Sequence, residues 1–117
     1  MYIWGNDYPT KDGTGARDYI HIKDLVEGHI SAIDFIKTFN GSVAFNLGTG
    51  NSITVLELIK KFENVNNIKI PISFEKRREG DVAECYADPA KAQKILNWKA
   101  KKTLEEMCKS SWKPFLK

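Results

Sequence analysis

The sequence predicts a single α/β domain, because short runs of β-type residues alternate with segments whose apolar residues recur at helical spacing. The chain has 117 residues, of which 42% are hydrophobic and 28% are charged. This length suffices for one core, and the apolar content excludes a disordered chain. The expected order is strand, loop, strand, helix, strand, helix, strand, loop and two helices.

The N-terminal region combines a short strand with a long loop. Tyr2–Trp4 is a short apolar run that we predict to be a strand, and residues 5–18 are rich in Gly, Asn, Asp and Pro. A loop of this length inside a compact domain is usually functional or disordered. Because β-type residues stand on both sides of it, with Tyr19–Ile22 as the second predicted strand, we favour a functional loop.

The middle of the chain predicts two helices around a strand. Residues 23–39 have apolar positions with a period of 3.6, which predicts a helix that ends before the turn Asn40–Gly41. Val43–Leu47 is expected to be a buried strand. The capping box formed by Thr54 and Glu57 then marks the start of the second helix.

The C-terminal part predicts one more strand and two more helices. Residues 69–74 favour a strand near a sheet edge, because they contain a proline. Residues 88–96 open with Asp-Pro, which is typical of a helix start. Residues 103–114 open with a second Thr-x-x-Glu capping box and predict the last helix.

Composition excludes several classes of protein. The net charge is only +3, and basic residues are mixed with acidic ones, so we expect no nucleic-acid partner. No apolar run approaches the roughly 18 residues of a membrane span, and the N-terminus has no signal-peptide pattern, so a cytoplasmic protein is expected. Cys85 and Cys108 stand far apart without a Cys/His cluster, which predicts neither a disulfide nor a metal site.

Two motifs that suggest nucleotide chemistry also have an ordinary explanation. Residues 48–50 form a Gly-Thr-Gly turn, but Ile53 stands where a dinucleotide fingerprint has its third glycine, which favours a simple turn. Tyr19 and Lys23 have the Tyr-x-x-x-Lys spacing of short-chain dehydrogenases. On a strand, however, they would be about 13 Å apart, too far for the lysine to assist the phenol.

Basic side chains leave two alternatives open. The run Lys76–Arg78 is either a solvated charged segment or the source of an arginine that holds a phosphate through two hydrogen bonds. Arg17, at the end of a Gly-rich loop, either ties the loop down through Asp18 or contacts a ligand. Spacing alone does not decide between these alternatives.

Motifs along almost the whole chain resemble those of one family. Together they resemble the C-terminal part of the UDP-glucose 4-epimerases, which are extended short-chain dehydrogenases/reductases. The motif Gly5–Thr10 is the most specific to this family, whereas the Arg-Asp-Tyr-Ile-His element is shared by many enzymes that act on nucleotide sugars. The motifs are Gly5–Thr10, Asp12–Gly15, Arg17–His21, Phe45–Gly50, Arg77–Asp81, Tyr86–Pro89 and Thr103–Met107.

The resemblance implies that residues 1–117 form a C-terminal UDP-sugar-binding domain of short strands with flanking helices. In that family an N-terminal Rossmann half binds NAD, which takes hydride from C4 of the hexose and returns it to the other face. That half, with its catalytic Tyr and Lys, has no counterpart here. We therefore expect no catalysis by this chain alone, and a homodimer for the longer enzyme.

Two other interpretations stay open at this stage. The chain could belong to another nucleotide-sugar epimerase, decarboxylase or dehydratase. It could also be a non-catalytic module that binds a UDP-sugar or a protein.

The resemblance also implies roles for individual residues in binding the nucleotide. The main chain near Tyr2 and Trp4 would face the uracil, although the family usually has Phe at the second position and a smaller residue at the first. Arg17 and Arg78 would hold the diphosphate, and Asp81 would lie near the ribose.

Cys85 occupies a position that the resemblance places beside the sugar. Family members with Tyr there are largely confined to UDP-glucose and UDP-galactose, whereas those with a small residue also accept N-acetylated hexosamines. The alternative is that Cys85 is a buried small hydrophobic residue on a strand, as free cysteines often are.

Overall fold

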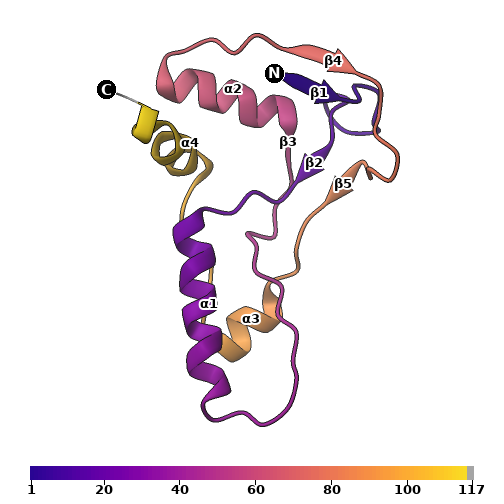
Figure 1. The fold of residues 1–117 in the computed structure, drawn as a ribbon. Coiled ribbons are helices and arrows are strands. Elements are labelled where there is room, and N and C mark those ends of the chain that lie inside the picture. The colour runs from indigo at the N-terminus through magenta and orange to yellow at the C-terminus, as the bar shows by residue number, and fades with distance from the viewer. Residues whose placement is uncertain (116–117) are drawn as a thin grey trace.

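The structure, a computed structural model, describes residues 1–115 and consists of four helices and five very short strands (Figure 1). The strands are β1 (Tyr2–Trp4), β2 (Ala16–Arg17), β3 (Ile53–Thr54), β4 (Ser73–Glu75) and β5 (Glu84–Cys85). The helices are α1 (Ile22–Ile36), α2 (Val55–Asn66), α3 (Ala90–Leu96) and α4 (Leu104–Trp112), with a 3-10 turn at Lys113–Phe115.

The strands form two small sheets. β1 pairs in parallel with β4, and β2 lies between an antiparallel β3 and a parallel β5. In this second sheet Arg17 is in register with Cys85, and Ala16 is in register with Thr54 and Glu84. Because paired residues share a face and neighbours along a strand alternate, Arg17 and Cys85 lie on one face of the sheet, and Ala16 and Glu84 lie on the other.

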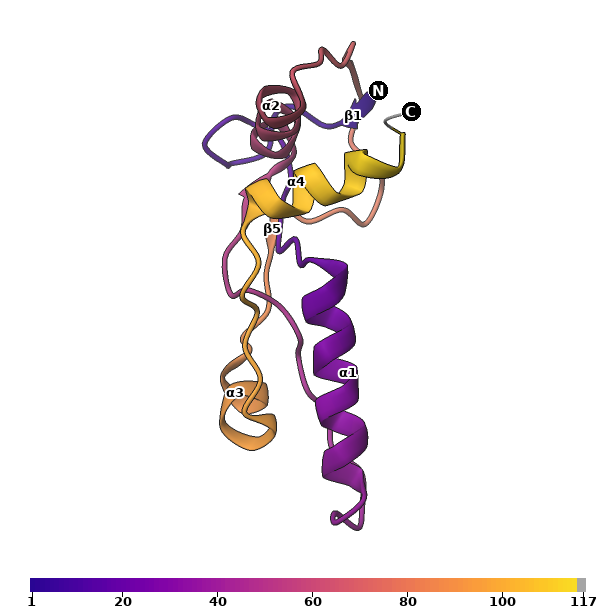
Figure 2. The same cartoon turned by 90° about the vertical axis from the view of Figure 1, so that its left-hand side faces the viewer.

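The helices gather in two places, with α2 and α4 packed together near the sheets and α1 packed against α3 at the other end (Figures 1 and 2). At the first end Phe62 and Trp112 meet edge to face, with 5.8 Å between ring centroids. At the second end Ala92, Leu96 and Trp98 form the buried cluster. A Cβ atom at Gly28 of α1 would lie 2.7 Å from the Leu47 side chain and 3.2 Å from the Trp98 ring, so the glycine there permits this close packing.

Asp24 in the first turn of α1 ties that helix to the chain between α3 and α4. Its carboxylate is 2% exposed and accepts hydrogen bonds from the backbone N–H groups of Lys101 and Lys102, at 3.0 and 2.8 Å. The indole N–H of Trp98 donates to its carbonyl at 2.9 Å. Oδ2 and the backbone carbonyl of Asp24 thus both accept hydrogen bonds from this segment, as burial of polar atoms requires.

The two helix starts predicted from capping boxes are confirmed, whereas the N-cap of α3 is Pro89 and not Asp88. Both capping boxes are present, at Thr54 with Glu57 and at Thr103 with Glu106. α3 begins one residue later than expected, at Ala90, whose N–H group is bonded by the Asp88 side chain at 3.0 Å. These features involve residues two or three positions apart, so the local sequence determines them.

Two of the predicted strands are wrong. Tyr19–Ile22 does not form a strand: His21 is the N-cap of α1, and its side chain accepts a hydrogen bond from the Lys23 N–H group. Val43–Leu47 pairs with no strand within residues 1–115. An apolar run becomes a strand only when another strand bonds to its backbone, and no such neighbour is present here for either segment. The strand expected at 69–74 is shorter and lies at Ser73–Glu75.

The apolar stripe of α1 is exposed instead of facing the core. Val26, Ile30, Ile33 and Ile36 are between 49% and 61% exposed, whereas the buried side of the helix contains Asp24 and the glycine at position 28. The radius of gyration is 16.8 Å, against about 13 Å expected for a compact domain of this length. The accessible surface is 8283 Å², against about 6,500 Å² expected from the mass. The described chain therefore leaves apolar surface open that a closed domain would bury.

No helix in the described part of the chain is long and apolar enough to cross a membrane.

Candidate functional site

The long loop after β1 is ordered by hydrogen bonds to one carboxylate. Asp12 accepts from the backbone N–H and the hydroxyl of Thr14, at 3.0 and 2.7 Å, and from the hydroxyl of Thr54 at 2.5 Å. Burial raises the pKa of Asp12, but these hydrogen bonds outweigh burial and hold the pKa below its ordinary value. The loop is therefore tied to the start of α2, and it delivers β2 in a fixed position.

A cavity of about 360 Å³ opens between this loop, β1, α2 and the segment that follows β4. Its volume falls within the range of small-molecule sites. Five of the six residues that the sequence assigned to substrate binding line it, together with seven others. The lining residues are Met1, Tyr2, Ile3, Trp4, Tyr8, Gly15, Arg17, Tyr19, Val55, Leu58, Arg78 and Asp81.

Two guanidinium groups and one carboxylate give this cavity its charge. Arg78 Nε donates to Asp81 Oδ2 at 3.0 Å, and Arg17 Nη2 lies 4.0 Å from Asp81 Oδ1. Arg17 also donates to the carbonyl of Ala16 at 2.7 Å, which fixes its side chain along β2. The guanidinium of Arg78 lies 5.9 Å from the ring centroid of Trp4. The arrangement places Arg78 near an aromatic ring and Arg17 in the same cavity, a combination suited to an aromatic ligand with phosphate groups.

The two consecutive arginines of the basic run have different surroundings. Arg77 turns away from Arg78: its Nε donates to Asp7 Oδ1 at 2.6 Å, and its guanidinium lies 4.1 Å above the ring centroid of Tyr8. Arg77 therefore holds the loop after β1, whereas Arg78 lines the cavity. All three residues of the run are exposed, as the solvated-segment interpretation predicts, but Arg77 and Arg78 each also make a specific ion pair.

Tyr19 lines the cavity, which its Tyr-x-x-x-Lys spacing did not predict. It lies in the extended segment between β2 and α1, where burial raises the pKa of its phenol and the neighbouring Arg17 opposes that rise. Val55 and Leu58, on the first turn of α2, complete the apolar side. No local signal identifies these three residues: Val55 and Leu58 reach the cavity through the packing of α2, and Tyr19 through the path of the chain after β2.

Cys85 is separated from this set. It lies on β5 beside Arg17 and on the same face of the sheet, but the residues that line the cavity within the described chain do not include it. The residue is exposed, so the alternative of a buried small hydrophobic residue is wrong in the structure of residues 1–115.

The Gly-Thr-Gly turn at 48–50 is organised by Asp18. The carboxylate accepts from the backbone N–H groups of Thr49 and Gly50 at 3.0 Å, from the Thr49 hydroxyl at 2.6 Å and from the Ala87 N–H at 3.2 Å. Burial raises the pKa of Asp18, but these hydrogen bonds outweigh it and leave the pKa below its ordinary value. Because an internal carboxylate occupies these N–H groups, the turn does not fit the pyrophosphate of NAD.

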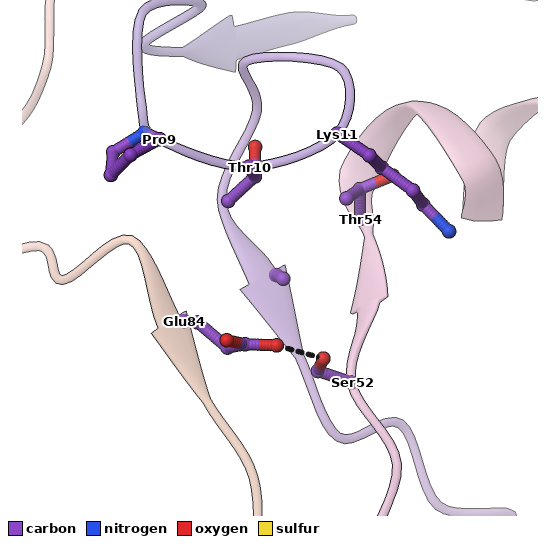
Figure 3. A pocket seen from close by; sticks show the side chains of 7 residues that line it. Pro9, Thr10, Lys11, Ser52, Thr54 and Glu84 are labelled. Atoms are coloured by element: carbon purple, nitrogen blue, oxygen red, sulfur yellow. Dashed lines mark hydrogen bonds between the residues drawn. The ribbon is translucent and has the colours of Figure 1, made fainter.

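A second cavity, of about 290 Å³, lies beside the three-stranded sheet (Figure 3). It is on the face that contains Ala16 and Glu84, opposite to the face of Arg17 and Cys85. Lys11, Thr54 and Glu84 line it, and the hydroxyl of Ser52 donates to Glu84. Lys11 is paired with Glu57, so its charge is already compensated. In residues 1–115 no group of three His, Cys, Asp or Glu side chains is placed to hold a metal ion.

Comparison with known proteins assigns the family. Residues 1–111 match the family model described as GDP-mannose 4,6 dehydratase. The UDP-glucose 4-epimerase of Bacillus subtilis is 55% identical over 113 residues, which are 97% of this chain and 33% of that protein. The human UDP-glucose 4-epimerase is 48% identical over 113 residues, 97% of this chain and 32% of that protein.

Solved structures agree with this assignment. The UDP-glucose 4-epimerase from Stenotrophomonas maltophila, with bound NAD and formylated UDP-arabinopyranose, superposes on this chain with a TM-score of 0.92 at 43% identity. The match covers 97% of this chain and 34% of that chain. The UDP-glucose 4-epimerase from Bifidobacterium longum, in complex with NAD+ and UDP, superposes with a TM-score of 0.91 at 47% identity, over 98% of this chain and 35% of that chain.

The chain belongs to the NAD-dependent epimerase/dehydratase family of nucleotide-sugar enzymes. Within that family it is a homologue of UDP-glucose 4-epimerase and spans about a third of the length of the relatives it matches. Its small α/β fold corresponds to about a third of the solved epimerase chains.

Proposed function

We propose that this chain is the C-terminal, UDP-sugar-binding part of an NAD-dependent UDP-glucose 4-epimerase, which interconverts UDP-glucose and UDP-galactose. One observation carries the proposal: Arg17 and Arg78, which are far apart in the sequence, line the same cavity as Trp4. A cavity with two guanidinium groups and an aromatic wall suits a ligand that combines a diphosphate with a flat base.

The proposed contacts follow the lining of the cavity. The main chain of β1 at Tyr2 and Trp4 would face the uracil, Arg17 and Arg78 would each hold a phosphate group, and Asp81 would accept from a ribose hydroxyl. The hexose would then extend past Arg17 toward Cys85. This order is consistent with the register of β2 and β5, in which Arg17 and Cys85 stand side by side.

These contacts would supply most of the binding energy through the nucleotide and little through the sugar. A sugar that must turn over between two half-reactions cannot be held tightly at the reacting ring. Affinity must therefore come from the nucleotide, which does not react, and two arginines on the diphosphate supply it. None of the residues of this chain is assigned to proton or hydride transfer.

NAD is proposed to bind to another part of the longer enzyme. The one glycine turn of this chain with a dinucleotide-like sequence, residues 48–50, has its N–H groups bonded to Asp18 and does not fit the cofactor. The exposed stripe of α1 and the unpaired segment 43–47 are consistent with a missing neighbour. We also propose that the longer enzyme is cytoplasmic and homodimeric.

Complementation tests the proposed function. This chain is mixed with, or joined to, the part of the Bacillus subtilis enzyme that it does not match, and conversion of UDP-galactose to UDP-glucose is measured in the presence of NAD. Binding of UDP to this chain alone is measured by calorimetry.

Three outcomes separate the interpretations. Turnover by the combined protein supports the epimerase. UDP binding without turnover in any combination indicates a binding module and sinks the catalytic part of the proposal. Absence of both, with a chain that is folded by circular dichroism, rules out the UDP site itself.

A further inference from the structure

Asp81 lies between the two arginines of the cavity. Its two carboxylate oxygens face different guanidinium groups, Oδ2 toward Arg78 at 3.0 Å and Oδ1 toward Arg17 at 4.0 Å. The backbone N–H of Asp81 also donates to the carbonyl of Arg78 at 3.3 Å, which closes a turn and holds the carboxylate in place. The side chain is 25% exposed and lines the cavity.

This arrangement sets the charge that a ligand meets. Among the described residues, the charged side chains that line the cavity are Arg17, Arg78 and Asp81, whose charges add to one positive, and Met1, which also lines it, carries the N-terminal ammonium. A UDP-sugar has a diphosphate diester with two negative charges. Free UDP has a terminal phosphate whose second proton leaves near pH 6, so it carries about three negative charges above neutral pH.

We propose that Asp81 is a charge-selectivity residue, which disfavours nucleotides with a free terminal phosphate relative to nucleotide sugars. The inference rests on the proposed function and deepens it. The repulsion between a carboxylate and each ligand charge falls with distance but is not removed in a partly enclosed cavity. Free UDP has one more negative charge at the end of its diphosphate, so its affinity is lowered more than that of a UDP-sugar. Such selection keeps the cavity available for the sugar diester when free nucleotide competes with it.

The substitution Asp81→Asn isolates the charge. The amide has the same shape as the carboxylate and retains an oxygen that can accept from Arg78 Nε, so the turn and the position of Arg78 are preserved. Any hydrogen bond from a ribose hydroxyl is weakened equally for both ligands, because both contain the same ribose. The ratio of the two dissociation constants therefore reports the charge of residue 81 and cancels a general loss of structure.

Asp7→Asn is the matched control. Asp7 is also paired with an arginine of the same segment, since Arg77 Nε donates to it at 2.6 Å. It does not line the cavity, and its side chain is 70% exposed. The two variants thus make the same chemical change in two arginine pairs, one inside the cavity and one outside it.

The experiment measures dissociation constants of UDP and UDP-glucose by calorimetry for the wild type and both variants, at about pH 8, where the terminal phosphate is fully charged. We expect Asp81→Asn to improve UDP binding relative to UDP-glucose by about three- to tenfold, the effect of one charge at a distance of several ångströms in a partly solvated site. Asp7→Asn should leave the ratio unchanged. If circular dichroism shows that Asp81→Asn is unfolded, Asp81→Ser provides a neutral substitute with the same expected direction.

The outcomes distinguish the inference from the function on which it rests. An unchanged ratio in folded position-81 variants that bind both ligands overturns the charge-selectivity role alone. An equal change in Asp7→Asn does the same, because it would show a general effect of net charge. If the wild type binds neither nucleotide, the proposed function fails and the inference fails with it.

Discussion

The guanidinium of Arg77 lies 4.1 Å above the ring centroid of Tyr8 and, through Asp7, anchors the loop that follows β1. Its neighbour Arg78 lines the cavity with Asp81. Two consecutive arginines thus contribute to different properties, one to the order of the loop and the other to the charge of the site. This contrast provides an internal control for the first prediction.

Substitution of Arg78 by Ala should weaken binding of UDP-glucose by roughly 2 to 5 kcal/mol, the range for removal of one member of a hydrogen-bonded charged pair at an interface. Arg17→Ala should have an effect in the same range. The reason is that a bidentate contact to each phosphate group is lost, whereas folding needs neither group. Calorimetry with the combined enzyme measures the affinity.

Arg77→Ala serves as the comparison. We expect it to reduce the free energy of unfolding by about 1 kcal/mol, because it removes a cation–π contact and an exposed ion pair. UDP-glucose affinity should change much less than in Arg78→Ala. Equal affinities of Arg78→Ala and the wild type would contradict the phosphate-binding role and support the interpretation of the basic run as a solvated segment.

Stability should fall in acid because of Asp18. Hydrogen bonds to its carboxylate keep the folded-state pKa below the unfolded value of about 4. The stabilisation is therefore fully present above that value and is lost as the pH falls through the lower, folded-state pKa. Urea unfolding between about pH 6 and pH 2.5 should show this decrease.

The variant Asp18→Asn separates this carboxylate from the others. Asp12 and Glu57 also have lowered pKa values and contribute to the acid loss of the wild type. The variant should be about 1 to 3 kcal/mol less stable at neutral pH, because it no longer offers a charged acceptor to Thr49. This difference should shrink as Asp18 becomes protonated in the wild type. A difference that stays constant with pH would contradict the assignment.

Local sequence determined the starts of α2 and α4 but not the sheets. The bonds of both capping boxes join residues three positions apart, so Thr54 and Thr103 were predictable. β2, β3 and β5 have two residues each and exist only because Arg17 meets Ile53 and Cys85 from distant parts of the chain. A run of two residues has no periodicity from which to predict a strand.

The site was predictable only through the resemblance. Arg17 and Arg78 had an ordinary interpretation and a functional one, and spacing did not separate them. Tyr19, Val55 and Leu58 were missed because a tyrosine in an extended segment and two apolar residues of a helix give no sign of facing a cavity. The structure adds Val55 and Leu58 because α2 directly follows β3, which pairs with β2, and it adds Tyr19 because that residue follows β2.

The chain alone should associate in solution. Val26, Ile30, Ile33 and Ile36 present a continuous apolar stripe on α1, of a kind that soluble monomers rarely leave exposed. We expect light scattering to show concentration-dependent oligomers and thermal unfolding to begin at low temperature. Ile30→Glu should reduce association while circular dichroism keeps its helical signal. A monodisperse, cooperative monomer with high thermal stability would sink this prediction.

The size of residue 85 should control which sugars the complete enzyme accepts. Cys85 lies next to Arg17 on the same face of the sheet, where a hexose bound beyond the diphosphate would pass. The small thiol leaves room for an acetamido group at C2, whereas a tyrosine ring would overlap it, and steric exclusion discriminates more strongly than an underfilled pocket does. We therefore expect the chain, combined with the remaining part of the Bacillus subtilis enzyme, to interconvert UDP-GlcNAc and UDP-GalNAc as well as the unsubstituted pair. Cys85→Tyr should abolish the first activity and spare the second, and Cys85→Ala should retain both. Equal turnover of UDP-GlcNAc by the wild type and Cys85→Tyr would show that residue 85 does not set the size of the sugar pocket.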